Sequence, residues 1–258
     1  MYYLGVDSGS TNCKIVLYKN EIIDYVILNT SWDPQESASK GISELLAKNQ
    51  VSLTDCQIIA TGYGREIIEQ AHLSLTEISS HARGGNYLND QISGIIDIGG
   101  QDCKIIAIKN GRVTNFLMND KCAAGTGRFL AMTCDKLGIT VAEIDDFIKS
   151  DKYVNIVSMC AVFAESEIVG LLARQVDRGE ILLGVIVSIA QRIKQMLAKL
   201  DFKETDLLLM TGGLAQSKII CQTITRETGL NIINDDYSLL AGALGAALHG
   251  KDKKESGR

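Results

Sequence analysis

The stretch Asp97-Ile98-Gly99-Gly100-Gln101-Asp102-Cys103-Lys104-Ile105 repeats a pattern found ninety positions earlier in the chain. The earlier copy is Asp7-Ser8-Gly9-Ser10-Thr11-Asn12-Cys13-Lys14-Ile15. Each copy follows an apolar run and precedes a second one, and each second run ends in Lys-Asn, at 19–20 and 109–110. The pattern predicts a strand, an Asp-x-Gly turn, a second strand and a tight turn, written twice. A repeat of this length predicts two duplicated lobes that face one another.

The two turns predict a nucleotide site between the lobes. Glycine lets a backbone approach a ligand closely, and clustered backbone N–H groups bind anions such as phosphate. Asp7 and Asp97 end the two strands, where each can hold Mg²⁺ or its waters, because this cation prefers oxygen ligands. Alternatively, each turn is only a hairpin with a structural Asp. The presence of two copies favours the nucleotide site.

The composition is that of a globular protein. The chain has 258 residues, of which 46% are hydrophobic and 22% charged, enough for one large or two small domains. A net charge of -5 argues against broad nucleic-acid binding. No apolar run reaches about 18 residues, and the N-terminus shows no signal pattern, so we expect no membrane segment. Seven scattered cysteines favour a reducing, cytoplasmic location.

Apolar periodicity predicts an α/β chain with a similar element order in each half. We expect a first lobe over 1–93 and a second over 94–238, with a helix at about 239–250 that packs back on the first lobe. The predicted strands lie at 2–6, 14–18, 22–28, 57–60, 95–98, 103–108, 113–118, 207–210 and 231–234. The predicted helices lie at 33–48, 65–71, 76–90, 161–177, 181–200 and 218–228, with one ending at 137, one opened by the capping-box pattern at 140–143, and a frayed tail from Lys251.

Glu77 opens a helix that must cross between the lobes. A carboxylate there can orient an attacking water, and the alternative is a first-turn Glu favoured by the helix dipole. His81, one turn later, is interpreted as a structural histidine rather than a ligand. Thr211-Gly212-Gly213 follows a buried strand, and such a turn can lie flat under the sugar and base of a nucleotide.

Cys122 and Cys160 differ from the other five cysteines, which core packing explains. Each of the two stands immediately before a helix, where the dipole and free N–H groups stabilise a thiolate or an anionic cluster. An iron–sulfur cluster normally takes four cysteines, and a two-fold dimer supplies four from one such pair. Zinc fits the same count. The spacing by itself is a weak signal, because no C-x-x-C is present.

The chain resembles the ATP-dependent activators of 2-hydroxyacyl-CoA dehydratases and the related benzoyl-CoA reductase ATPase subunits, of the BadF/BadG/BcrA/BcrD type. The resemblance covers nearly the whole chain, and its most specific block surrounds Cys122. Its motifs are Gly5-Val6-Asp7-Ser8-Gly9-Ser10-Thr11, Thr61-Gly62-Tyr63-Gly64-Arg65, Ile96-Asp97-Ile98-Gly99-Gly100-Gln101-Asp102, 119–130, 160–167, 211–216 and 242–247. The chain departs from the family near 79–84, with Ser80 where many relatives carry Cys and Arg83 where a smaller residue is common.

The resemblance implies a duplicated ribonuclease-H-like fold, as in actin, Hsp70 chaperones and sugar kinases (the ASKHA fold). It also implies a homodimer with one [4Fe-4S] cluster at the interface, held by Cys122 and Cys160 of each chain. Further implications are Mg²⁺ held through water at Asp7 and Asp97, and a catalytic set of these two aspartates with Gln101 and Glu77. The implied ATP or ADP contacts are Gly9, Ser10, Thr11, Asn12, Lys14, Gly99, Gly100, Gln101, Gly212, Gly213, Gln216 and Gly242.

The function implied by the resemblance is ATP-driven electron delivery. A ferredoxin or flavodoxin would reduce the shared cluster, and the dimer would pass one low-potential electron to an iron–sulfur dehydratase or a double-cubane-cluster reductase. Two alternatives remain open. A small-molecule kinase of the same fold would need a substrate cleft, for which the chain has few insertions. A nucleotide-gated binding module without a redox role would tolerate the loss of both cysteines.

Overall fold

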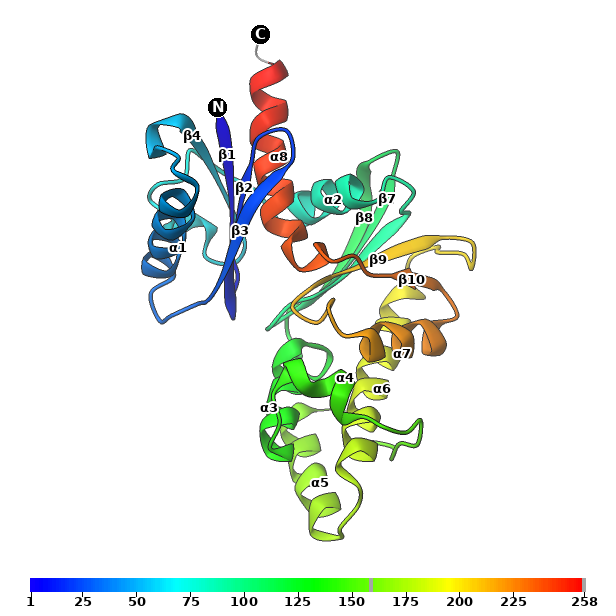
Figure 1. Cartoon of the computed structure of the whole chain (residues 1–258). Coiled ribbons are helices and arrows are strands. Elements are labelled where there is room, and N and C mark those ends of the chain that lie inside the picture. The colour runs from blue at the N-terminus through cyan, green and yellow to red at the C-terminus, as the bar shows by residue number, and fades with distance from the viewer. Residues whose placement is uncertain (158–159, 257–258) are drawn as a thin grey trace.

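The computed structural model describes residues 1–157 and 160–256, which form two lobes with helices between them (Figure 1). Each lobe contains one mixed five-stranded sheet, in the order β3-β2-β1-β4-β5 and β10-β9-β6-β7-β8. The first sheet consists of β1 (Tyr2–Ser8), β2 (Asn12–Tyr18), β3 (Ile22–Asn29), β4 (Cys56–Thr61) and β5 (Leu73–Ser74). The second consists of β6 (Gly94–Ile98), β7 (Cys103–Lys109), β8 (Arg112–Asn119), β9 (Leu207–Gly212) and β10 (Asn231–Ile233).

Both sheets have the same local topology, which explains the sequence repeat. In each, three antiparallel strands form a meander, and a later strand pairs in parallel with the first strand of that meander. The central strands β1 and β6 are covered on both faces and therefore read as continuous apolar runs. The edge strand β3 instead alternates between partly buried and exposed residues.

Two helices are exchanged between the lobes. α2 (Glu77–Leu88) packs on the second sheet, where Ala82 joins a buried cluster with Ile95 and Ile106. α8 (Ala241–Ser256) packs on the first sheet, with Ala243 and Leu244 in the cluster that covers one of its faces. The sequence-based division at residue 93 stays a prediction. α2 precedes that division in the chain but packs on the second sheet.

The exchanged helices cross at very close range because glycines face backbone atoms. A Cβ at Gly245 of α8 would lie 1.7 Å from the carbonyl oxygen of Ser80, and one at Gly84 of α2 would lie 1.9 Å from that of Ala241. α8 remains helical to Ser256, and Asp252 forms an ion pair with Arg83 at 2.8 Å. The expectation of a frayed tail from Lys251 was therefore wrong for the described residues.

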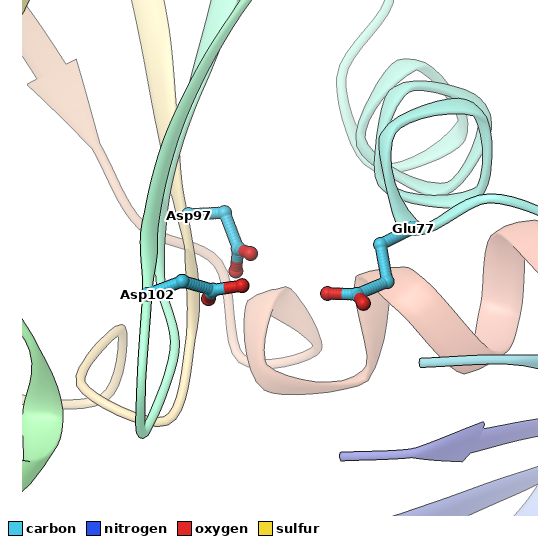
Figure 2. A group of neighbouring side chains, drawn as sticks. All are labelled: Glu77, Asp97 and Asp102. Carbon is cyan, nitrogen blue, oxygen red and sulfur yellow. The ribbon is translucent and has the colours of Figure 1, made fainter. Parts of the chain in front are cut away.

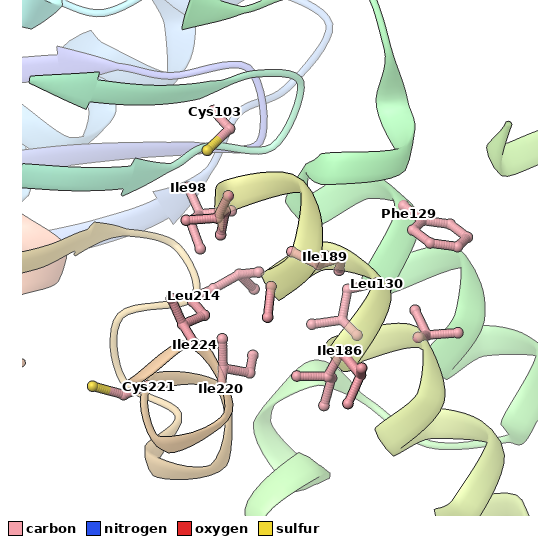
Figure 3. Close-up of a cluster of buried hydrophobic side chains, with 14 of the residues drawn as sticks. Ile98, Cys103, Phe129, Leu130, Ile186, Ile189, Leu214, Ile220, Cys221 and Ile224 are labelled. Carbon is pink, nitrogen blue, oxygen red and sulfur yellow. The ribbon is translucent and has the colours of Figure 1, made fainter. Parts of the chain in front are cut away.

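The outer faces of the sheets are covered differently. The first sheet carries α1 (Pro34–Asn49), which is capped by the Asp33 carboxylate and starts with proline, as the sequence predicted. The second sheet lies over a larger helical layer with a single apolar core, which includes Phe129, Ile186 and Ile220 (Figure 3). This layer consists of α3 (Gly127–Leu137), α4 (Ile144–Phe147), α5 (Ala161–Ala173), α6 (Arg178–Leu197) and α7 (Lys218–Thr228).

Most predicted elements are confirmed, and the predicted helix at 65–71 is wrong. Only a single 3-10 turn forms there, at Arg65–Ile67, and Ile68 is extended and buried. His72 then donates its backbone N–H to the carbonyl of Ile58, which draws the chain back to the sheet edge as β5. The capping box at Thr140 and Glu143 is present, but it opens only a 3-10 turn and the four-residue α4. Among the described residues, no helix has the length and apolar character needed to cross a bilayer.

Candidate functional site

A cavity of about 840 Å³ lies where the two Asp-x-Gly turns face each other. The turns and the starts of α2 and α3 supply most of its polar surface, and the strand-to-Gly-Gly turn after β9 closes one side. Its lining residues are Asp7, Gly9, Ser10, Thr11, Asn12, Lys14, Asn29, Tyr63, Glu77, His81, Asp97, Ile98, Gly99, Gly100, Gln101, Asp102, Lys104, Met118, Asp120, Gly127, Arg128, Ala131, Val141, Gly212, Gly213 and Leu214.

The two turns are built alike and touch each other. In each, the first glycine donates its N–H to the carbonyl three residues on, from Gly9 to Asn12 at 3.2 Å and from Gly99 to Asp102 at 2.9 Å. A Cβ at Gly100 would lie 2.2 Å from the Thr11 hydroxyl oxygen, so the approach of the turns requires glycine there. Both turns therefore present backbone groups to one small volume, as phosphate binding requires.

Each turn carries a buried aspartate–lysine pair in the same strand register. Asp7 pairs with Lys14 across β1 and β2, and Asp97 pairs with Lys104 across β6 and β7. Residues directly opposite on antiparallel strands point to the same face, so each lysine meets its aspartate. The Nζ–Oδ2 distances are 3.2 Å in the first lobe and 3.3 Å in the second.

The second pair belongs to a larger charged cluster (Figure 2). Lys104 Nζ also lies 2.7 Å from Asp102 Oδ2 and 2.8 Å from Glu77 Oε2. One carboxylate oxygen from each of Glu77, Asp97 and Asp102 lies within 4.8 Å of the others. Hard cations such as Mg²⁺ prefer such oxygen ligands. Of the two aspartates predicted to hold Mg²⁺, Asp97 belongs to this group, whereas Asp7 is paired with Lys14 outside it.

His81 reaches Asp97 from α2 through a threonine. The Thr211 hydroxyl donates to Asp97 Oδ1 at 3.2 Å, and Thr211 Oγ1 lies 3.0 Å from His81 Nδ1. Because the hydroxyl proton is used on Asp97, we assign the Nδ1 proton to His81, which donates it to Thr211. His81 is buried and hydrogen-bonded, in agreement with a structural role, and it also lines the cavity.

The surrounding charges keep Asp97 ionised. Burial by itself would raise the pKa of Asp97, but His81, Lys104 and Lys14 outweigh it and lower that pKa to about 2. Burial likewise works to lower the pKa of Lys104, yet Asp97, Glu77 and Asp102 together raise it. The same balance with Asp7 and Asp97 raises the pKa of Lys14. Both lysines are therefore fixed positive charges at the base of the cavity.

The residues expected on the adenosine side lie in three different environments. Gly212 and Gly213 line the cavity, and Gly212 has φ +87, a value that favours glycine. Gly242, at the start of α8, packs against His81 and Asp7, where a Cβ would lie 2.8 Å from His81 Nε2. Gln216 is exposed in the turn before α7 and is not one of the described residues that line the cavity.

The seven cysteines, all within the described residues, fall into two groups. Burial raises the pKa of the thiols of Cys13, to about 12, and of Cys134, to about 11, and it acts in the same direction on Cys56, Cys103 and Cys221. Cys122 is only partly buried and Cys160 is exposed. Core packing therefore accounts for five cysteines and leaves these two.

Cys122 and Cys160 each stand immediately before a helical segment. Cys122 precedes the 3-10 turn Ala123–Gly125 that leads into α3, and its sulfur lies 3.8 Å from Arg192 Nη1. Cys160 precedes α5, whose second and third residues, Val162 and Phe163, are 69% and 70% exposed. A partly buried thiol beside a cation, an exposed thiol, two helix starts and uncovered apolar side chains fit an anionic metal cluster at a contact between chains.

A chain with this cavity, this repeat and this cysteine pair matches one family of ATPases. The sequence model of the BadF/BadG/BcrA/BcrD ATPase family matches residues 4–250. The chain belongs to that family. It is 38% identical to the 2-hydroxyisocaproyl-CoA dehydratase activator of Clostridioides difficile, over 99% of this chain and 97% of the relative. It is 37% identical to the (R)-2-hydroxyglutaryl-CoA dehydratase activating ATPase of Acidaminococcus fermentans, over 98% of each.

Solved structures agree with this assignment. The activator of the 2-hydroxyisocaproyl-CoA dehydratase from Clostridium difficile, solved with bound ADPNP, superposes with a TM-score of 0.93 at 37% identity, covering 99% of this chain and 97% of that one. The actin-like two-lobed fold extends to MreB 5 of Spiroplasma citri, with a TM-score of 0.60 at 16% identity, covering 99% and 97%. The duplicated α/β fold of the ASKHA class is therefore confirmed.

Sequence reasoning missed Lys104 as part of the site, although it occupies the position of Lys14 in the repeat. Thr211 was expected in the turn under the nucleotide, but its contact with Asp97 was missed. That contact had no local signal, since it depends on the parallel pairing of β6 with β9. A second hollow of about 500 Å³ lies between the end of α4, α6 and α7, and no described residue predicted to be functional lines it.

Proposed function

We propose that this chain is an ATP-hydrolysing activator that passes one low-potential electron to a partner iron–sulfur enzyme. The acceptor is a 2-hydroxyacyl-CoA dehydratase or a double-cubane-cluster reductase, and the donor is a ferredoxin or flavodoxin. Two chains share one [4Fe-4S] cluster, held by Cys122 and Cys160 of each. Membership of an ATPase family and high identity to two dehydratase activators support the proposal.

One contact carries the proposed coupling between nucleotide and cysteines. The second Asp-x-Gly turn is hydrogen-bonded to the start of α3, from the N–H of Gly127 to the carbonyl of Gly99 at 2.8 Å and from that of Arg128 to Gly100 at 2.9 Å. Cys122 lies in the segment just before this helix. A nucleotide that binds one position of the turn more tightly than another therefore also favours one position of the Cys122 segment.

The metal groups fit the residues present. We propose Mg²⁺ between the nucleotide phosphates and the carboxylates of Asp7 and Asp97, reached through water. When bound, a [4Fe-4S] cluster supplies a one-electron carrier, and its four thiolates require two copies of the Cys122 and Cys160 pair. The exposed apolar side chains Val162 and Phe163 beside Cys160 suit burial against a second copy of the chain.

The nucleotide contacts follow from the lining of the cavity. We propose that the N–H groups and hydroxyls of 9–12, with Lys14, bind the phosphates from one side, and that 99–101 bind them from the other. Gly212 and Gly213 would lie against the adenosine, with Gln216 beyond them, and Gly242 would bring the start of α8 against Asp7. Glu77 would orient the water that attacks the terminal phosphate, giving ADP and inorganic phosphate.

Anaerobic reconstitution of purified chain with iron and sulfide tests the shared cluster. Wild-type chain should bind about four iron atoms per two chains and should run as a dimer by native mass spectrometry. Cys122→Ala should lose the iron and most of the dimer. Cys134→Ala is the matched control, because Cys134 is buried in the same lobe and should leave both properties unchanged. A normal cluster in Cys122→Ala would contradict the proposal.

A further inference from the structure

Lys104 is the most crowded cation in the cavity. Lys104 occupies the same strand register as Lys14. Three carboxylates surround the ammonium of Lys104, whereas Lys14 forms one ion pair among the described residues. Its side chain is 3% exposed. An ammonium has three N–H donors. Carboxylate oxygens at 2.7, 2.8 and 3.3 Å therefore surround the ammonium, and the one at 3.3 Å, from Asp97, accepts a hydrogen bond from it.

A phosphate that enters the cavity competes with these three carboxylates for the Lys104 ammonium. Asp97 and Asp102 lie on the same hairpin as Lys104, and Asp97 is also held by Thr211. Glu77 comes from a separate element, the first turn of α2, and reaches across to the hairpin (Figure 2). Its side chain is 23% exposed, so its carboxylate can move into the cavity without a change in the sheet.

We propose that Lys104 is a positioning residue that holds the Glu77 carboxylate while the cavity is empty and releases it when a nucleotide phosphate takes over the ammonium. The exchange places a free carboxylate beside the phosphate only after the nucleotide has bound. Glu77 is thereby kept from its water-orienting role until its substrate is present. The inference rests on the proposed function in requiring that the cavity binds ATP and that Glu77 orients the attacking water.

The affinity for ADPNP, measured by titration calorimetry on the full chain prepared without oxygen, tests the exchange. Glu77→Gln removes the competing charge and keeps the side-chain shape, so it should lower the Kd about tenfold, as expected for one charged hydrogen bond. A purely structural role for Glu77 predicts weaker binding, and a purely catalytic role predicts an unchanged Kd. Either result would overturn the proposal.

Two further variants isolate the role of Lys104. Glu36→Gln makes the same change in the first turn of α1, at an exposed residue outside the cavity lining, and should change the Kd by less than about twofold. Lys104→Arg keeps the positive charge and supplies five donors, so phosphate and Glu77 no longer compete. In that background Glu77→Gln should change the Kd less than about twofold. A tenfold gain that persists there contradicts the exchange, whereas wild-type chain that fails to bind ADPNP contradicts the proposed function itself.

Discussion

The two Asp-x-Gly turns have the same backbone and different charges. Asp7 faces Lys14 as Asp97 faces Lys104, and both turns close through the same type of glycine hydrogen bond. The first lobe has Asn12 where the second has Asp102, and α2 brings Glu77 to the second lobe only. The duplication has thus kept the geometry of the turn, which depends on glycine and strand register, while the side chains around it have diverged.

This difference assigns unequal tasks to equivalent positions. The first turn combines the carboxylate of Asp7, one of the two proposed Mg²⁺ partners, with an ammonium and an amide that suit phosphate. The second turn gathers three carboxylates around one ammonium, a set suited to a divalent cation and an attacking water. The second turn is also the one hydrogen-bonded to the helix that follows Cys122. Under the proposed function, the attacking water and the link to the Cys122 segment both belong to the second lobe.

The largest expected loss of stability comes from adding a methyl group where α2 and α8 cross. Gly245→Ala should destabilise the chain by at least about 4 kcal/mol, because the new methyl overlaps a buried backbone carbonyl. Gly170→Ala is the control, since a Cβ there meets nothing within 4 Å, and it should stabilise by about 0.5 to 1 kcal/mol. Urea unfolding midpoints measure both. Equal effects of the two substitutions would contradict the close crossing.

The next largest expected loss of stability comes from neutralising either of the two equivalent aspartates. Asp7→Asn should destabilise by about 3 kcal/mol, because it leaves the buried ammonium of Lys14 without its ion-pair partner. Asp97→Asn should destabilise less, by about 2 kcal/mol, since Asp102 and Glu77 still neutralise Lys104. Urea unfolding at pH 7 in EDTA gives both values. The reverse order would show that the extra carboxylates do not compensate Lys104.

Acid sensitivity sharpens the comparison further. The pKa of Asp97 falls from 3.8 to about 2 on folding, so the unfolded chain binds the proton more tightly. The ionised Asp97 therefore adds about 2 kcal/mol to the free energy of unfolding above about pH 4, and this stabilisation disappears as the pH falls through about 2. Metal-free unfolding curves from pH 6 to 2 should show this loss. Asp97→Asn should flatten the plot of the free energy of unfolding against pH in this range. An unchanged slope would contradict the low pKa assigned to Asp97.

The smallest expected effect comes from exchanging one side chain between the turns. Asn12→Asp gives the first turn the sequence of the second at this position and should weaken ADPNP binding about tenfold, because a carboxylate repels phosphate and competes for Lys14. Asp102→Asn makes the reverse change and, in the absence of Mg²⁺, should strengthen binding severalfold. Titration calorimetry measures both. Changes of the same sign would show that the two turns do not contact the nucleotide from opposite sides.

Much of the fold was accessible from the sequence because its signals are local. The strands around both turns follow from apolar runs bounded by glycine, and Asp33-Pro34 correctly marks the start of α1. The predicted helix at 65–71 failed for the opposite reason. Its apolar residues fit a helix, but Ile68 is used to anchor a loop and β5 is pulled to the sheet edge by a backbone hydrogen bond from His72.

The sequence by itself determined the duplication, the two aspartate turns and the difference between Cys122 with Cys160 and the other cysteines. Each of these depends on residue type and spacing, which a chain carries before it folds. Only the tertiary structure decided that Gly84 and Gly245 set the close crossing of α2 and α8, that Thr211 joins His81 to Asp97, and that Glu77 shares Lys104 with two aspartates. These contacts join residues far apart in the sequence, and packing alone brings them together.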